Sequence, residues 1–501
     1  MLRTLLLSLL VCFLLPLCAR GESTNEAIAR ATAAIQAVVP RAQADPARPV
    51  FHVMPPAQWM NDPNGPIYYK GYYHLFYQLT PFSDEGGIKY WGHVRSRDLV
   101  KWESLPIALW PSTELGEESV WSGCCTINGE GKPMAFYTSI GQGKSAFDQA
   151  VQWAALGDDD LITWHKTPAN PVLSEEVNEG TKIYDWRDPF IFHDGKKTFL
   201  VAGGHLAKRG DAAVNIYEAE NAGLTRWKYR GVLFHVPGAP TAECPNFFKL
   251  GDEWVLFVSP YNHVQYFVGD FDPVTCRFEP RTQGLLDYGS FYAPSTMQVP
   301  DGRRMVWGWV NGFPGGHGWN GCLSLPRLLS LSRDGQLRQN PAPQLTKLRG
   351  KAIEFHNILL DNSTATARIA GMKLPLKNND VFLGIWNTNT IEIQAEVDMA
   401  TAKNFEMQIG DSKNILPIVV GFDGTELRVM DVKAPLTLTG ERNLNLHIFL
   451  DRSVLEVFAN ESVCITKTIP PHAAAANLKL HADGGSATVK RIQAWPMKTV
   501  W

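Results

Sequence analysis

The sequence predicts an all-β protein in which a five-bladed β-propeller is followed by a C-terminal β-sandwich. Three observations lead to this prediction. From Phe51 onward, short apolar runs are broken by Gly, Pro and Asp, which is typical of short strands joined by turns. A tryptophan-containing motif recurs at near-constant spacing in the first part of the chain. In the second part, apolar and polar residues alternate with the period of a half-buried strand.

The N-terminal residues predict an export signal. Arg3 supplies the positive charge, an apolar run covers residues 5–17, and Ala19-Arg20-Gly21 is a small-x-small cleavage site. The apolar run is too short to span a bilayer. We therefore expect residues 1–21 to be a signal peptide and the protein to be secreted or periplasmic. Residues 22–49 form an Ala-rich lead-in in which we expect a short helix.

Composition excludes several classes of partner. The chain has 501 residues, with 47 Lys and Arg against 50 Asp and Glu, and a formal net charge of −3. This balance gives no support to a nucleic-acid or anionic-membrane partner. The cysteines beyond the signal sequence show no C-x-x-C spacing and are sparse for this length, so neither a disulfide framework nor a zinc site is expected.

An internal repeat defines the first domain. Trp102, Trp164 and Trp227 each follow a turn-forming stretch that contains a Leu three residues earlier, and they recur at intervals of 62 and 63 residues. A looser fourth copy lies at residues 275–278. In all-β sequence, this period matches one four-stranded blade of a propeller. We therefore expect a five-bladed propeller over residues 50–338.

The remainder of the chain predicts a separate β-sandwich. Pro341-Ala342-Pro343 lies in a polar stretch that marks a domain boundary. Within residues 345–501, the alternating segment 446–450, the turn 451–453 and the apolar segment 454–458 predict a hairpin. No catalytic constellation is visible in this half.

Three acidic motifs lie in the propeller segment. Asp62 is part of the run Trp-Met-Asn-Asp-Pro-Asn-Gly at residues 59–65, where Pro and Gly predict a rigid turn. Asp188 follows Arg187, and Glu243 precedes Cys-Pro-Asn, each ahead of an apolar strand. Because blades begin near the propeller axis, we expect the three carboxylates to converge in one funnel. The many aromatic residues after Asp62 suit a sugar, whose C–H faces stack on rings.

The surroundings of the three acids suggest different roles in glycoside cleavage. That reaction needs one carboxyl group to protonate the leaving oxygen and another to attack the anomeric carbon or activate water. Asp62, held by its turn, is the candidate nucleophile. Glu243 lies beside apolar residues, which raise a carboxyl pKa and suit an acid/base. Asp188 is expected to stay ionised next to Arg187 and to stabilise positive charge in the transition state.

Taken together, these motifs resemble glycoside hydrolase family 32, the β-fructofuranosidases, which include invertases, inulinases, levanases and related fructosyltransferases. The resemblance covers essentially everything after residue 50. Beyond the three acidic motifs, it rests on Trp121-Ser122-Gly123, Asp287-Tyr288-Gly289, Phe291-Tyr292-Ala293, Gly308-Trp309 and Ser324-Leu325-Pro326-Arg327.

The resemblance implies a retaining mechanism. Asp62 would form a covalent fructosyl-enzyme, Glu243 would act as acid and then as base, and Asp188 would hold fructose hydroxyls. No metal or organic cofactor is implied. The implied partner is a fructose-containing oligo- or polysaccharide, and the oligomeric state stays open. The implied substrate-binding residues are Asn61, Gln78, Trp91, Trp121, Ser122, Arg187, Asp287, Tyr292 and Trp309.

Several alternatives remain at this stage. Ser290 stands where plant-like, sucrose-preferring members carry Lys, so the choice among sucrose, inulin and levan is open. A fructosyltransferase would use the same residues with a different acceptor. An inverting arabinan- or xylan-degrading propeller enzyme and a catalytically dead carbohydrate-binding protein are the other candidates, and the context of Asp62 and the presence of all three acids argue against them.

Overall fold

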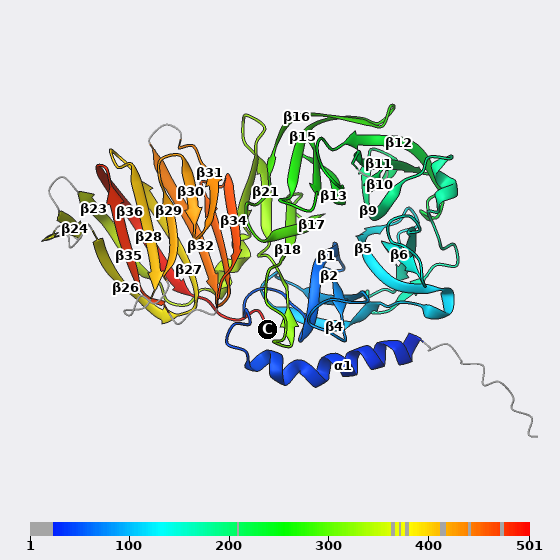
Figure 1. Cartoon of the computed structure of the whole chain (residues 1–501), viewed down its shortest axis with the longest axis horizontal. Helices are drawn as coiled ribbons and strands as arrows, with labels where there is room; N and C mark the ends of the chain where they lie inside the picture. Colours follow the sequence, from blue (N-terminus) through cyan, green and yellow to red (C-terminus); the bar gives the residue numbers. More distant parts are fainter. Residues whose placement is uncertain are drawn as a thin grey trace, which may run out of the picture.

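The computed structural model describes residues 24–207, 210–361, 366–369, 372–375, 380–410, 417–438, 442–470 and 475–501. The expected signal peptide, residues 1–21, lies outside these ranges. The predicted fold class is confirmed: a propeller and a sandwich lie side by side, and one long helix runs along the edge of the propeller (Figure 1).

Five sheets of the described residues form the propeller. Blade one contains β1 (Gln58–Tyr69), β2 (Tyr72–Thr80), β3 (Tyr90–Ser96) and β4 (Trp102–Leu109). Blade two contains β5 (Glu117–Ile127), β6 (Pro133–Gly141), β7 (Val151–Gly157) and β8 (Trp164–Lys166). Blade three contains β9 (Tyr184–Asp194), β10 (Lys197–His205), β11 (Ala212–Ala219) and β12 (Trp227–His235).

Blade four contains β13 (Glu243–Leu250), β14 (Glu253–Ser259), β15 (Gln265–Asp272) and β16 (Arg277–Leu285). Blade five contains β17 (Phe291–Gln298), β18 (Arg304–Val310), β21 (Arg327–Leu331) and β22 (Leu337–Pro341), and β20 (Cys322–Leu323) pairs with β18. Short 3-10 helices are η1 (Thr113–Leu115), η2 (Glu175–Asn178) and η3 (Pro343–Leu348).

The inner strands close the blades into a ring. The first strand of each blade packs against the first strands of its neighbours, and β17 lies next to β1. The short strand β19 (Trp319–Asn320), from the loop of blade five, pairs in parallel with Gln58 and Trp59 at the start of β1. This pairing joins the last blade to the first.

The repeated tryptophans begin the fourth strands of the first three blades. Leu99, Leu161 and Leu224 have left-handed backbones, with φ of 65°, 61° and 55°, and are buried. In each copy, the indole N–H of the following Trp donates to that Leu carbonyl, at 3.0, 2.9 and 3.1 Å. In the looser fourth copy, Cys276 takes the left-handed position with φ 56°. The repeat is therefore one turn that recurs between the third and fourth strands of a blade.

Two sheets form the sandwich. The larger has the order β25 (Met372–Pro375), β24 (Thr366–Ile369), β23 (Ile353–Asp361), β36 (Ser486–Pro496), β27 (Thr390–Asp398), β32 (Asn443–Asp451), β33 (Val454–Ala459) and β34 (Val463–Thr468). The smaller has the order β26 (Asp380–Thr388), β35 (Ala475–Asp483), β28 (Asn404–Gly410), β29 (Ile418–Phe422), β30 (Glu426–Val429) and β31 (Val432–Pro435). The expected hairpin is β32–β33.

The expected N-terminal helix is α1 (Thr24–Ala44). Its buried residues Ala27, Ala31 and Ile35 are spaced four apart, so they form one face, which lies against blade one (Figure 1). No helix in the described part of the chain is long and apolar enough to cross a membrane.

Buried charges join the propeller to the sandwich. Arg327 of β21 pairs with Asp287, which precedes β17, and with Glu456 of β33, at 3.0 and 2.7 Å. His52 binds Asp451 of β32 and Glu456 at 2.8 and 3.1 Å. All five side chains are fully buried, so the two domains share an ionic interface.

Candidate active site

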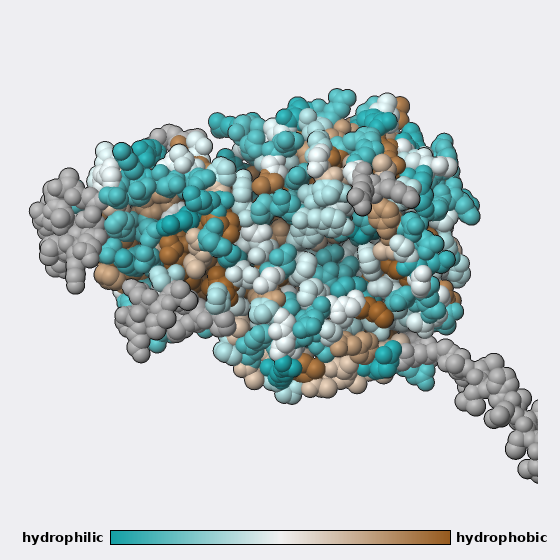
Figure 2. Space-filling model, in the orientation of Figure 1, coloured by the Kyte–Doolittle hydropathy of each residue, from teal (hydrophilic) through white to brown (hydrophobic). Residues whose placement is uncertain are grey.

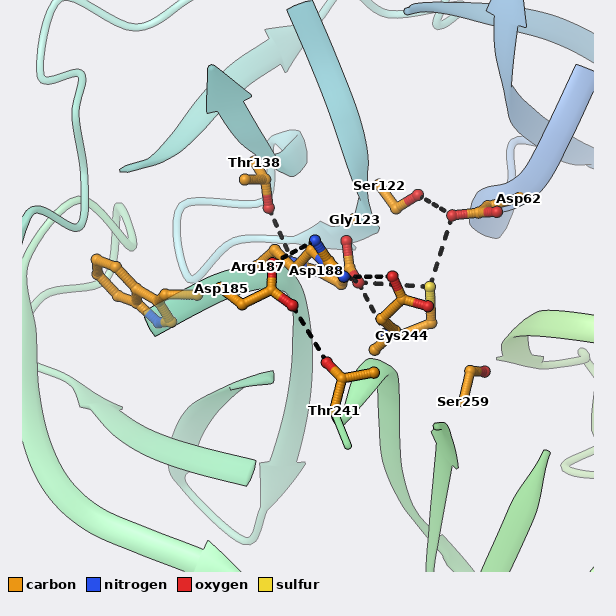
Figure 3. A network of polar contacts seen from close by, with 12 residues as sticks. Asp62, Ser122, Gly123, Thr138, Asp185, Arg187, Asp188, Thr241, Cys244 and Ser259 are labelled. Atoms are coloured by element: carbon orange, nitrogen blue, oxygen red, sulfur yellow. Dashed lines mark hydrogen bonds and ion pairs between the residues drawn. The ribbon is translucent and has the colours of Figure 1, made fainter. Parts of the chain in front are cut away.

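The three acids lie on the first strands of three blades, as expected. Asp62 belongs to β1, Asp188 to β9 and Glu243 to β13. Figure 3 shows Asp62 approaching Asp188 and Cys244 from the opposite side of the funnel. The Cys244 thiol lies 3.6 Å from a carboxylate oxygen of Asp62 and 3.6 Å from one of Asp188. Hydrophilic residues gather at the centre of the propeller in Figure 2.

The Asp-Pro-Asn-Gly segment is not the isolated β-turn that the sequence suggested. It lies inside β1, and the register of β1 against β2 shifts between Met60 and Pro63 and again between Asn64 and Ile67. Gly65 has a left-handed φ of 47°, and a Cβ there would clash with Cys125. Two register shifts within β1 thus take the place of the predicted turn, and such shifts change the direction in which the side chains of the strand point.

A chain of hydrogen bonds holds Asp62. The Trp59 indole N–H donates to Asn61 Oδ1 at 3.0 Å, and Asn61 Nδ2 donates to Gln78 Oε1 at 2.6 Å and to Asp62 Oδ1 at 3.0 Å. Gln78 Nε2 donates to Ser122 Oγ, which donates to Asp62 Oδ2, both at 2.5 Å. Asp62 stays partly exposed, so its carboxylate is fixed but accessible. Trp59 was not among the predicted binding residues, although it opens the same motif as Asn61 and Asp62.

Asp188 is buried at a strained position. Its φ is 59°, its N–H donates to Thr138 Oγ1 at 2.8 Å, and its Oδ2 accepts the Cys244 N–H at 2.9 Å. Burial raises the pKa of Asp188 to about 6, Arg187 opposes this rise, and the charge of Asp62 adds to it. The expectation that Arg187 keeps Asp188 ionised therefore holds only above about pH 6. Arg187 Nε lies 3.7 Å from Asp188 Oδ2. The closer contacts of Arg187 are made by its Nη1 and Nη2 atoms with other residues.

Glu243 has the environment of an acid/base. Tyr292 Oη donates to its Oε2 at 2.6 Å, and Arg187 pairs with its Oε1. Burial raises the pKa of Glu243 to about 7; Arg187 opposes the rise, and the charge of Asp188 adds to it. Glu243 is therefore a carboxyl group that is still largely protonated in mildly acidic solution.

Arg187 is held by residues that the sequence analysis did not select. Its Nη1 pairs with Asp185 Oδ1 at 2.5 Å, and its Nη2 donates to Tyr261 Oη at 2.7 Å. Asp185 also accepts from Thr241 Oγ1 at 3.3 Å (Figure 3). The sequence could have indicated the Asp185–Arg187 pair, because side chains two residues apart in a strand lie on the same face. Nothing in the sequence indicated the contact of Arg187 with Tyr261.

Three partly exposed indole rings lie near the residues that bind the acids. The rings of Trp59 and Trp309 lie 5.7 Å apart between centroids, with their planes at 59°. The Arg187 guanidinium lies 5.5 Å from the ring centroid of Trp121. The predicted residues Trp121 and Trp309 are thus adjacent to Arg187 and to Trp59, and their binding of a sugar stays a prediction.

Two predicted binding residues do not face the funnel. Trp91 is fully buried, and its indole N–H donates to the Trp121 carbonyl at 2.9 Å, so it supports the wall from behind. Asp287 is also fully buried, because Arg327 and Thr466 occupy its carboxylate at 3.0 and 2.7 Å. The expectation that Asp287 binds substrate is therefore wrong: Asp287 belongs to the ionic interface with the sandwich.

Within the described residues, no group of three or more His, Cys, Asp and Glu side chains is arranged to hold a metal ion. The six cysteines of the described chain are free thiols, and five of them are buried. The acidic groups of the site are the partly exposed carboxylate of Asp62, the buried carboxyl group of Asp188, and Glu243, whose pKa is raised.

Two family models together match most of the chain. Residues 52–341 match the glycosyl hydrolases family 32 N-terminal domain, and residues 344–496 match the glycosyl hydrolases family 32 C-terminal domain. The chain is 32% identical to the levanase of Bacillus subtilis, over 91% of this chain and 71% of that protein. It is 30% identical to the raffinose invertase of Escherichia coli, over 89% of this chain and 94% of that protein.

Solved structures share the fold. A mutant GH32 β-fructofuranosidase of Bombyx mori in complex with sucrose has a TM-score of 0.78 at 26% identity, covering 95% of this chain and 99% of that chain. Fructan 1-exohydrolase IIa of Cichorium intybus has a TM-score of 0.77 at 23% identity, covering 91% and 98%. The chain therefore belongs to glycoside hydrolase family 32, and it is a glycosidase of the β-fructofuranosidase type.

Proposed function

We propose that this protein is an exported, retaining β-fructofuranosidase that releases fructose from sucrose and from inulin- or levan-type fructans by double displacement. The observation that carries the proposal is the pairing of two carboxyl groups with different surroundings. Asp62 is partly exposed and held by Ser122 and Asn61, while the pKa of Glu243 is raised to about 7 by burial.

In the first step, the Asp62 carboxylate attacks the anomeric carbon of the fructosyl unit. The bond to the leaving oxygen breaks, and that oxygen takes the proton of Glu243. The product is a covalent ester between Asp62 and fructose. Tyr292 and Arg187 orient the Glu243 carboxyl through one oxygen each, which fixes the direction of proton transfer.

In the second step, Glu243 acts as a base. Its carboxylate takes a proton from water, the water oxygen attacks the anomeric carbon, and the Asp62 carboxylate leaves. Asp188 lies beside both reacting groups and carries negative charge above about pH 6. A negative charge there favours the oxocarbenium-like transition states of both steps.

The relatives support the choice of substrate. The chain resembles a levanase and a raffinose invertase along most of its length. Neighbouring structures hold sucrose in the Bombyx mori enzyme and 1-kestose in the Cichorium intybus enzyme. Both sugars carry a terminal fructosyl unit, and the indole rings of Trp59 and Trp121 offer apolar faces on which its C–H groups would stack.

A product assay tests this function. The purified protein is incubated with sucrose, inulin and levan, and the products are separated by chromatography. Fructose release from at least one substrate is expected. Longer products in place of fructose would instead indicate the alternative, a fructosyltransferase.

Methanol tests the stereochemistry. Because the second of two successive inversions restores the anomeric configuration in the product, adding methanol should yield the methyl β-fructofuranoside. The α-anomer would contradict the double displacement and favour a single inversion. Export is tested separately, by N-terminal sequencing of the protein secreted from an expression host, where cleavage after residue 21 is expected.

A further inference from the structure

An exposed aromatic ring lies beside the acid/base. Tyr261 follows β14, its side chain is 60% exposed, and its φ is 60°. Bulky residues rarely adopt a left-handed backbone, and such strain persists only where the surrounding structure imposes it. The position of this ring is therefore unusual in both exposure and conformation.

Hydrogen bonds hold Tyr261 at both ends. Arg187 Nη2 donates to its Oη at 2.7 Å, and its own N–H donates to Tyr292 Oη at 2.9 Å. Both partners bind Glu243: Arg187 pairs with Oε1, and Tyr292 donates to Oε2 at 2.6 Å. The ring is thus a rigid surface at a fixed position relative to the carboxyl that protonates the leaving oxygen.

A second pair of rings is linked to Tyr261 through Asp185. Phe147, in the loop between β6 and β7, is 37% exposed, and its ring lies 5.3 Å from that of Tyr184. The Phe147 carbonyl accepts the N–H of Asp185, and Asp185 Oδ2 in turn accepts from Tyr261 Oη at 3.4 Å. Asp185 therefore connects the two aromatic groups.

We propose that these rings bind the leaving-group side of the substrate. Tyr261 stacks on the sugar unit that carries the scissile oxygen, and the Phe147–Tyr184 pair stacks on the unit beyond it. Sugars present C–H faces that pack on aromatic rings, and a preorganised ring loses little conformational freedom on binding. The proposal rests on the proposed function, and it implies a preference for leaving groups of two or more sugar units.

Three substrates separate the contributions. Methyl β-fructofuranoside has a leaving group without a ring, sucrose has one sugar unit, and 1-kestose has two. We expect Tyr261→Ala to lower kcat/KM by about three- to tenfold for sucrose and 1-kestose relative to the methyl glycoside. Phe147→Ala is expected to lower kcat/KM for 1-kestose alone. Tyr261→Phe keeps the ring and should keep the preference.

The methyl glycoside serves as the reference for damage to Glu243. A disturbance of Arg187 or Tyr292, which hold Glu243, should lower kcat/KM for all three substrates equally. An equal loss on all three in Tyr261→Ala would overturn the proposal, as would unchanged ratios in both alanine variants. Phe382→Ala is the matched control: this ring is 58% exposed on the sandwich, and we expect no change. If the wild-type protein releases no fructose from any substrate, the proposed function itself fails instead.

Discussion

Two buried clusters of charge use the same residue types to opposite effect. The catalytic cluster places Asp185, Asp188 and Glu243 around Arg187, and the pKa values of Asp188 and Glu243 rise to about 6 and about 7. The interface cluster places Asp287, Asp451 and Glu456 around Arg327 and His52, and there the pKa of Glu456 falls.

The difference lies in the number of donors. Burial alone would raise the pKa of Glu456, but Arg327, His52 and the Leu325 N–H, at 2.7 Å, lower it. Asp451 accepts three successive backbone N–H groups, those of residues 50–52, at 2.8 to 3.1 Å. Burial would lower the pKa of His52, but its bonds to Asp451 and Glu456 raise it to about 9.

In the catalytic cluster, the single guanidinium of Arg187 is shared by Asp185, Asp188 and Glu243. Its charge offsets only part of the effect of burial, so the pKa values of Asp188 and Glu243 stay raised. The carboxyl groups of an interface are satisfied, whereas those of an active site are left short of partners. Such under-compensation is how a folded protein produces an acid that is protonated near neutral pH.

The largest expected effect is the loss of turnover when a catalytic carboxyl is removed. Glu243→Gln should lower kcat by about 10²- to 10⁴-fold, since no group then protonates the leaving oxygen. Asp62→Asn should lower it further, because no covalent intermediate forms. Steady-state fructose release measures both, and circular dichroism should show that both variants fold. Near wild-type rates in either variant would refute the assigned roles.

The interface cluster should respond in stability instead. Arg327→Met leaves Asp287 and Glu456 buried without their cation, which should cost roughly 3–5 kcal/mol of unfolding free energy. Urea unfolding measures this loss. Arg428→Met is the control, because Arg428 is paired with Glu406 on the sandwich surface and such pairs contribute about 1 kcal/mol or less. Equal losses in the two variants would contradict the contrast between buried and exposed pairs.

A smaller effect, of opposite sign, is expected when Glu243 is neutralised. The folded pKa of Glu243 is raised from 4.5 to about 7, so its stabilising contribution is complete below about pH 4.5 and is lost as the pH rises through about 7. Glu243→Gln, which mimics the protonated acid, should therefore stabilise the protein by up to about 3 kcal/mol at pH 8. Thermal unfolding should show this gain at pH 8 and not at pH 5.

At the interface, the contribution of His52 is also lost as the pH rises, but in a more alkaline range. The pKa of His52 is raised from 6.5 to about 9, so its contribution is complete below about pH 6.5 and is lost as the pH rises through about 9. His52→Gln should therefore destabilise the protein at pH 6 and have a much smaller effect at pH 10. A penalty that is the same at both pH values would show that packing, rather than charge, makes the contribution.

The smallest effect concerns the pH profile of the wild-type enzyme. If Asp188 must be ionised and Glu243 protonated, kcat/KM should form a bell with limbs near pH 6 and pH 7. Asp188→Asn should lower the maximum rate and remove the acid limb near pH 6. Retention of that limb in the variant would assign it to another group.

The sequence alone predicted what is encoded locally. The recurring turn with Trp102, Trp164 and Trp227 depends on residues three apart, and it indicated the blades correctly. The three acids lie at the starts of inner strands, which the blade repeat could locate. The pairing of strands was harder to predict from the sequence. The two register shifts in β1, which replaced the expected turn, depend on how β1 pairs with β2.

Features that depend on distant residues could not be predicted. Asp287 was assigned to the substrate, but its partner Thr466 lies 179 residues away, in the other domain. Trp91 was expected in the pocket, but its indole N–H donates to the carbonyl of Trp121, a residue 30 positions later in the sequence. Tyr261 became visible only when Arg187 and Tyr292 were seen to hold it.

The pairing of β19 with β1 has a consequence for the position of Asp62. The joint between the last blade and the first runs through Gln58 and Trp59, in the same strand as Asp62. Gly321 packs so closely there that a Cβ would lie 2.9 Å from the Trp309 indole nitrogen. A movement of blade five relative to blade one would therefore displace the start of the strand that carries Asp62, so the closure of the ring and the position of this carboxylate are coupled.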